Sequence, residues 1–164
     1  MVWAKNFLKK LMQQERSPEK LALSFCVGNY IAFSPFPFFH TVMVFLFSWL
    51  FKLNLGVTFA TSCFINNPWT MIPVYGADYA LGYWLVYKVF NLNIYHYNPW
   101  WMYSINNLCE GTLGIAKPCI WSFLIGGNLL GIGLSLLLYP IMKKVFAYYL
   151  AVEFGTAYEN NYTK

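Results

Sequence analysis

Apolar residues fill most of this chain in long runs that prolines, asparagines and lysines interrupt. The runs cover residues 21–34, 38–51, 55–65, 69–87 and 118–142. Only the last, which carries no charged residue, is long enough to cross a hydrocarbon core of ~30 Å as a helix that rises ~1.5 Å per residue. The pattern therefore predicts an all-α chain in which one spanning helix accompanies several shorter helical arms.

The first two apolar runs meet at Pro35 and Pro37. Proline ends or kinks a helix because it lacks the backbone N–H and its ring collides with the preceding turn. A helix from residue 21 to this break would be only ~21 Å long, so it need not cross a bilayer. We therefore predict that residues 21–51 form a re-entrant-like helical hairpin, with a single kinked helix as the alternative.

Residues 55–87 repeat this design. Asn66, Asn67 and Pro68 interrupt the apolar run, and Pro73 follows soon after. We predict a second proline-broken, re-entrant-like hairpin over this range. Two short interrupted segments in succession are typical of transporters whose binding sites are built from discontinuous helices.

The run over residues 118–142 is predicted to span the membrane. It contains Gly127 and Gly131 in the GxxxG spacing, which lets another helix pack closely. A second copy of the chain or another membrane protein could supply such a helix. Two lysines follow the run at once, so residues 143–164 are predicted to form a cytoplasmic or interfacial tail.

Two further segments are predicted to lie at the membrane surface. Residues 1–16 place apolar and basic side chains on opposite faces of a helix, as expected for an amphipathic helix in the interface plane. Docking of that helix on a partner protein is the alternative. Residues 91–117 are rich in tyrosine and tryptophan, which favours an interfacial loop. Residues 17–142 then form a single membrane domain.

Composition and charge separate membrane partners from nucleic acid. Hydrophobic residues make up 59% of the chain and charged residues 10%, against ~25% charged residues in soluble domains. The net charge of +5 suits an anionic membrane or nucleic acid. Five bases fall in the first twenty positions, however, and residues 21–87 contain one. This distribution favours membrane lipids over nucleic acid and places both termini in the cytoplasm. The number of crossings should then be even, so we predict a multi-pass protein in which the broken segment over residues 55–87 also reaches the far side.

A string of short motifs resembles a known bacterial family. The most specific part is Asn-Pro-x-Thr-x-x-Pro-x-Tyr, which follows a Pro-x-x-x-x-His-Thr string. The matching positions are Ser17-Pro18-Glu19, Gly28, Ser34-Pro35, His40-Thr41, Leu53-Asn54, Asn66 to Thr70, Pro73, Tyr75 and Gly82. The chain resembles the bacterial domain of unknown function 2062 family from about Ser17 to beyond Gly126.

This resemblance implies an uncharacterised integral protein of the bacterial inner membrane, and it supplies no catalytic residue. The proline-broken hairpins are also similar in architecture to those of DedA-type lipid transporters. That second similarity is an analogy of fold and does not by itself indicate function.

The polar groups at the second break are candidates for a binding site. An unsatisfied polar group at membrane depth costs several kcal/mol, so Asn66, Asn67 and Thr70 need partners. One interpretation is that they and the free N–H groups of the following helix receive an anionic headgroup or an ion. The other is that they cap the helix ends and bond to the first break at His40 and Thr41. Both interpretations remain open at this stage.

Asp78 is the only acid in residues 21–87. An ionisable residue within a membrane segment is a functional candidate by default, and a proton-coupling or ammonium-binding role would suit a carboxylate. Alternatively, Asp78 faces water or pairs with Lys52, Lys88 or His40.

Catalytic and metal motifs are missing from the sequence. No nucleophile elbow, phosphate loop or paired carboxylate is present, and the four cysteines are scattered without a CxxC pair. We therefore predict no enzyme activity, no cofactor and no metal site.

Three hypotheses for function follow. The first is handling or translocation of a lipid or lipid-linked phosphate at a site formed by the two broken segments. The second is a noncatalytic membrane scaffold or assembly factor that packs through the GxxxG helix. The third is an enzyme that acts on lipid headgroups.

Overall fold

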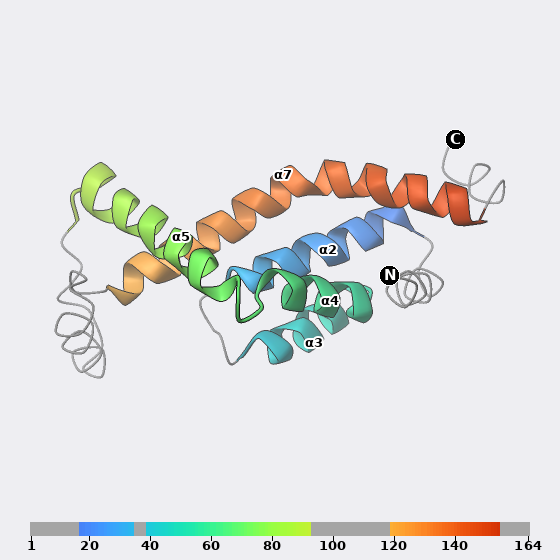
Figure 1. The fold of residues 1–164 in the computed structure, drawn as a ribbon, viewed down its shortest axis with the longest axis horizontal. Coiled ribbons are helices and arrows are strands. Elements are labelled where there is room, and N and C mark those ends of the chain that lie inside the picture. Colours follow the sequence, from blue (N-terminus) through green and yellow to red (C-terminus); the bar gives the residue numbers. More distant parts are fainter. Residues whose placement is uncertain (1–16, 35–38, 93–118, 155–164) are drawn as a thin grey trace.

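The computed structural model describes residues 17–34, 39–92 and 119–154, and all regular structure in these ranges is helical, which confirms the predicted all-α class (Figure 1). The helices are α2 (Pro18–Ala32), α3 (His40–Leu50), α4 (Leu55–Ile65), α5 (Met71–Tyr83) and α7 (Ile120–Phe154), and a π-helical segment η2 (Trp84–Val89) continues α5. The predicted amphipathic helix over 1–16, Pro35, Pro37 and nearly all of the predicted loop over 91–117 lie outside the described residues.

Side-chain caps fix where two of the helices begin. The Ser17 hydroxyl accepts a hydrogen bond from the N–H of Lys20, and Pro18 occupies the first helical position of α2, where no N–H is needed. At the start of α4, the Asn54 side chain accepts a hydrogen bond from the N–H of Val57 at 3.0 Å. These caps satisfy N–H groups that a helix end otherwise leaves unpaired.

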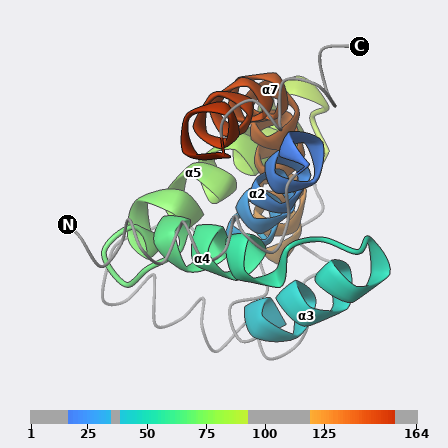
Figure 2. The same cartoon turned by 90° about the vertical axis from the view of Figure 1, so that its right-hand side faces the viewer.

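The helices α3, α4 and α7 pack against α2, and α5 packs on α7. The long helix α7 runs antiparallel to α2, because Glu19 at the start of α2 meets Lys143 late in α7. The helix α4 runs parallel to α2 on another side, and α5 crosses the first half of α7 (Figure 1). In both views α3 lies on the far side of α2 and α4 from α7 (Figure 2).

The carboxyl-terminal helix extends beyond its predicted end. Residues 118–142 were expected to span and 143–164 to form a tail, but α7 continues to Phe154 through Pro140 and the two lysines. The extension is held by packing, because Phe146 and Leu150 join a buried cluster. Their partners in that cluster are Leu21, Ala22 and Val57. Charge at a helix surface does not end a helix when its other face is buried.

Small residues decide which helices approach most closely. At Gly28 of α2, an added methyl carbon would lie 2.5 Å from the carbonyl oxygen of Thr58 on α4. One turn earlier, the Ser24 hydroxyl accepts a hydrogen bond of 2.8 Å from the N–H of Asn54. The closest neighbour of α2 in the amino-terminal half of the chain is therefore α4, and α3 packs against α2 less extensively.

The second predicted hairpin does not close on itself. The segment breaks between Ile65 and Met71 as predicted. Its two arms, α4 and α5, have only slight contact with each other, because α5 packs on α7 instead. The range 55–87 is therefore a broken segment whose first half, α4, packs on α2 and α3 and whose second half, α5, packs on α7.

Two glycines create the contact between α5 and α7. A methyl group at Gly82 of α5 would overlap the carbonyl oxygen of Ser122, and one at Gly126 of α7 would overlap the carbonyl oxygen of Asp78. The backbones of the two antiparallel helices therefore touch. We call this contact the α5–α7 junction.

The predicted GxxxG face is occupied within the chain. A methyl carbon at Gly127 would lie 2.6 Å from the carbonyl oxygen of Phe33, and one at Gly131 would lie 3.0 Å from the ring of Tyr30. Both contacts are with α2. A partner molecule would have to use another face of α7, because this one is covered.

The surface of the described residues is strongly apolar. Among them, one helix is long and apolar enough to cross a membrane, α7 over Ile120–Val152. Its Leu136 and Leu137 are 71% and 69% exposed, and Trp49 on α3 is 79% exposed. Contiguous apolar surface of this kind favours membrane association.

The junction makes a prediction for stability. Gly126→Ala should destabilise the protein by about 3 kcal/mol, the upper part of the range for overpacking, because the added methyl group overlaps the backbone of α5. Thermal unfolding of the purified protein in detergent measures this loss.

Gly133→Ala is the matched control on the same helix, because nothing lies within 4 Å of the added methyl group. It should leave stability unchanged or raise it by up to about 1 kcal/mol through helix propensity. Equal effects of the two substitutions would contradict the described junction.

A second prediction concerns the ion pair between α2 and α7. Lys143 Nζ lies 3.1 Å from Glu19 Oε1. Burial raises the pKa of Glu19, but the hydrogen bond from its own backbone N–H, Lys143 and Ser17 together hold the pKa below its ordinary value. The resulting stabilisation is present above the ordinary glutamate pKa of ~4.3 and is lost as pH falls through the lower folded value.

The effect is small, at most about 1 kcal/mol, because solvent screens both side chains. Unfolding temperatures of the native protein and Glu19→Gln should differ at pH 7 and converge towards pH 3. A difference that does not change with pH would show that this ion pair does not contribute.

Candidate functional site

Asn66 is the centre of a polar cluster between three helices. Its side-chain Nδ2 lies 3.2 Å from the carbonyl oxygen of Ala32, 3.3 Å from His40 Nδ1 and 3.0 Å from the Tyr75 hydroxyl. An amide nitrogen carries two hydrogens, so the three acceptors share them. Asn66 thus joins the end of α2, the start of α3 and the first turns of α5.

His40 completes the link to the first break. Its Nε2 lies 3.1 Å from the carbonyl oxygen of Ser34. A carbonyl can only accept, so Nε2 carries the hydrogen and Nδ1 is free to accept from Asn66 in the neutral ring. The residues that flank the two breaks, His40 and Asn66, are therefore in contact. Whether they bind a ligand stays a prediction.

Asn67 and Thr70 form the turn itself. The Asn67 side-chain oxygen accepts from the N–H groups of Trp69 at 2.9 Å and Thr70 at 3.1 Å. The Thr70 hydroxyl donates to the carbonyl oxygen of Ile65 and accepts from the N–H of Asn67. The N–H of Met71 bonds to the Asn67 carbonyl oxygen at 2.8 Å.

These bonds use the N–H groups of Trp69, Thr70 and Met71, where an anionic headgroup was expected to bind. The local geometry therefore favours the capping interpretation for Asn67 and Thr70, because their polar atoms already have partners within the turn. A phosphate would have to displace several of these bonds.

The remaining predicted residues of the breaks have different positions. Thr41 lies in the first turn of α3 and is exposed. Pro68 lies in the turn between α4 and α5, as predicted. Pro73 was predicted as a break but lies in the first turn of α5. A proline is tolerated there because the N–H groups of the first turn have no partner within the helix.

Asp78 is completely buried at the α5–α7 junction. Its exposed fraction is 0%, and neither carboxyl oxygen has a hydrogen-bond partner among the described residues. The expected alternatives, a wet surface or an ion pair with Lys52, Lys88 or His40, are wrong, since no such contact forms in this part of the chain. An ionised carboxylate without a partner is strongly unfavourable in such a site.

Two residues near the α5–α7 junction were missed as site residues by sequence reasoning. Tyr75, one turn earlier on α5, interacts electrostatically with Asp78 and also bonds to Asn66. Ser122 on α7 is completely buried, and its hydroxyl has no partner among the described residues. Tyr75 lies three residues before Asp78, a spacing that places both side chains on one face of a helix. Nothing in the sequence around Ser122 indicates that this residue is buried.

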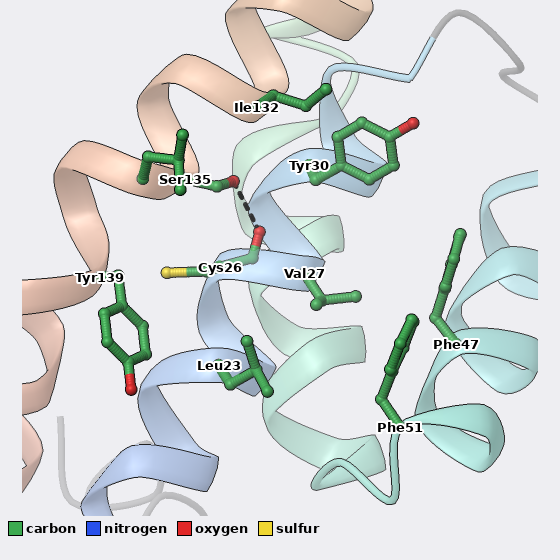
Figure 3. A pocket seen from close by; sticks show the side chains of 10 residues that line it. Leu23, Cys26, Val27, Tyr30, Phe47, Phe51, Ile132, Ser135 and Tyr139 are labelled. Carbon is green, nitrogen blue, oxygen red and sulfur yellow. Dashed lines mark hydrogen bonds between the residues drawn. The ribbon is translucent and has the colours of Figure 1, made fainter.

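An apolar groove of about 420 Å³ lies beside this cluster. The close-up in Figure 3 shows α2 as its floor, α7 as one wall and α3 as the other. The hydroxyl of Ser135 is satisfied by the Cys26 carbonyl oxygen at 2.8 Å and by Asn29 at 3.0 Å. The lining residues are Leu23, Cys26, Val27, Tyr30, Phe47, Phe51, Ile132, Ser135, Leu136 and Tyr139.

The groove ends close to the buried carboxyl group of Asp78. Tyr30 lines the groove and contacts Gly131, which also contacts Phe33. The carbonyl oxygen of Phe33 in turn lies beside Gly127 and Asp78. One turn of helix, ~5.4 Å, therefore separates the end of the groove from the buried carboxyl group.

The described ranges contain no cluster of metal-binding side chains and no disulfide. No group of three His, Cys, Asp or Glu side chains gathers there. Cys26, Cys63 and Cys119 are free thiols, of which the first and last are buried.

Comparison with known proteins identifies the family. The family described as "Uncharacterized protein conserved in bacteria (DUF2062)" matches residues 2–153. The chain belongs to this family. No curated protein and no solved structure matches it, and the expected similarity to DedA-type lipid transporters is not supported. The chain is therefore an uncharacterised member of a bacterial family and has one possible membrane span.

The polar cluster makes a prediction. Asn66→Ala should destabilise the protein by about 1–2 kcal/mol, because it removes the donor shared by Ala32, His40 and Tyr75 and leaves partly buried acceptors unpaired. Thr41→Ala, at the exposed neighbour of His40, should change stability by less than about 0.5 kcal/mol. Thermal unfolding in detergent measures both, and equal stabilities of the two variants would show that the cluster contributes nothing to the fold.

Proposed function

We propose that this protein is an integral protein of the bacterial inner membrane that binds a membrane lipid in the groove between α2, α3 and α7 and moves it between the two leaflets. The groove carries the proposal, because its apolar walls suit an acyl chain. Its volume of about 420 Å³ falls within the ~300–1,000 Å³ typical of ligand pockets.

The arrangement of the short helices supports a membrane-embedded site. With 11 residues each, α3 and α4 would cover only ~16 Å of a ~30 Å hydrocarbon core. In this proposal both enter the bilayer beside the spanning helix α7, α3 as a re-entrant arm and α4 as the first half of the broken segment over residues 55–87, which reaches the far side. Their ends then bring His40 and Asn66 to membrane depth, where a polar headgroup needs partners.

The topology in this proposal has both termini in the cytoplasm, so the number of crossings is even and the broken segment over residues 55–87 supplies the second crossing beside α7. The contact between Glu19 and Lys143 supports it, because this contact puts the start of α2 and the charged part of α7 at the same end of the molecule. Basic residues near that end favour the cytoplasmic side.

A free acceptor atom suggests what kind of headgroup would fit. Among the described residues, no donor reaches Asn66 Oδ1. This atom accepts hydrogen bonds, whereas the N–H groups of Trp69, Thr70 and Met71 are already used. A headgroup that donates hydrogen bonds, such as an ethanolamine, fits this arrangement better than a bare phosphate.

Filling the groove tests the proposal. We expect Val27→Trp to reduce lipid movement at least about tenfold, because the indole would occupy the space assigned to the acyl chain. The assay follows labelled phosphatidylethanolamine in liposomes of phosphatidylethanolamine and phosphatidylglycerol, with protein-free liposomes as the baseline.

Leu137→Trp is the matched control, since Leu137 is exposed on α7 and does not line the groove. It should retain the full rate. A native protein no faster than empty liposomes, or equal rates for the two tryptophan variants, would refute the proposed role of the groove.

A further inference from the structure

The α5–α7 junction contains a carboxyl group without any partner in the described part of the chain. Asp78 is 0% exposed, and a methyl carbon at Gly127 would lie 3.4 Å from its Oδ2. At Gly126 the backbones touch. The side chain is therefore enclosed by helix backbone on the side of α7.

The described residues around Asp78 place no cation beside it. On α5, the titratable group that faces Asp78 is Tyr75. From α7 come Gly126, which meets the Asp78 backbone, and Gly127, which meets its carboxyl group, and the carbonyl oxygen of Phe33 at the end of α2 also lies at Gly127. Within the described ranges, no lysine, arginine or histidine reaches the carboxyl group. The carboxylic acid is thus neutral while the junction is closed.

We propose that Asp78 is a proton-binding site and that loss of its proton separates α5 from α7. In the step, the O–H bond of the carboxyl group breaks, its electron pair stays on the carboxylate and the proton passes to water that enters the opening junction. An ionised Asp78 gains hydration only when the helices part, so ionisation and opening favour each other.

Opening would be transmitted to the polar cluster. Tyr75 precedes Asp78 by one turn of α5 and accepts the hydrogen bond from Asn66. Movement of α5 away from α7 therefore pulls on the link between α2, α3 and α5. This proposal goes beyond lipid movement and does not depend on the lipid, because it concerns only the junction.

The thiol of Cys119 can report whether α5 has separated from α7. This cysteine lies directly before α7 and is 1% exposed, in contact with Tyr79 on α5 and Tyr87 on η2. Separation of α5 from α7 uncovers its thiol. A protein in which Cys26, Cys63 and Cys109 are replaced by serine leaves this one thiol to react with a maleimide.

The experiment compares maleimide labelling rates between pH 6 and 9 in this single-cysteine protein with and without Asp78→Asn. The amide has the size of the neutral acid and does not titrate, so the ratio of the two rates cancels the pH dependence of the thiol. We expect the ratio to rise with pH by up to about tenfold per unit, the limit for one proton. A ratio that stays constant with pH would overturn the proposal.

Two further outcomes decide the matter. The Asp78→Asn protein should fold and label slowly at every pH, because its junction stays closed; a misfolded or rapidly labelled variant would contradict the neutral state assigned to Asp78. Ser122→Ala alters the same junction without changing a titratable group and should keep the rise with pH. Loss of the rise in this variant would attribute the effect to packing and overturn the assignment to Asp78.

Discussion

The backbone contact between α5 and α7 is the constraint on which the rest of the structure depends. Two glycines, Gly82 and Gly126, allow it, and no residue with a side chain could replace either without pushing the helices apart. Because α5 packs on α7, it has only slight contact with α4, and the two halves of the broken segment over residues 55–87 lie apart. The backbone contact also encloses Asp78 between the two helices.

A second consequence is that α7 uses two adjacent faces within one chain. The face at Gly126 meets α5, and the face at Gly127 and Gly131 meets α2. The long helix thereby fixes α2 and α5 relative to each other and brings the polar ends of the short helices together. The groove follows from the same arrangement, since α2 lies between α7 and α3 (Figure 3).

Much of the helical framework could be predicted from the sequence. The all-α class, the break between α4 and α5 and the apolar carboxyl-terminal helix follow from hydrophobic runs and from residues that end helices. These are local properties of the backbone. Pro73 shows the limit of such reasoning, because a proline in the first turn looks the same in the sequence as one that breaks a helix.

What could not be predicted depends on tertiary packing. The continuation of α7 past Lys143 depends on Phe146 and Leu150 reaching α2. The pairing of α2 with α4 depends on Gly28 meeting Thr58. Asn66 and His40 were recognised as candidates, but Tyr75, which connects them to the buried carboxyl group, was recognised only as part of the family motif. Periodicity shows that a face is apolar without showing which helix covers it.

The central claim is that the groove between α2, α3 and α7 holds a membrane lipid. Native mass spectrometry of the intact protein, released from bacterial membranes in mild detergent, tests it most directly. The account predicts that one lipid molecule remains bound to each chain and that phosphatidylethanolamine is enriched over its share of the membrane. A chain that consistently appears without lipid, under conditions that keep its helices folded, would contradict it.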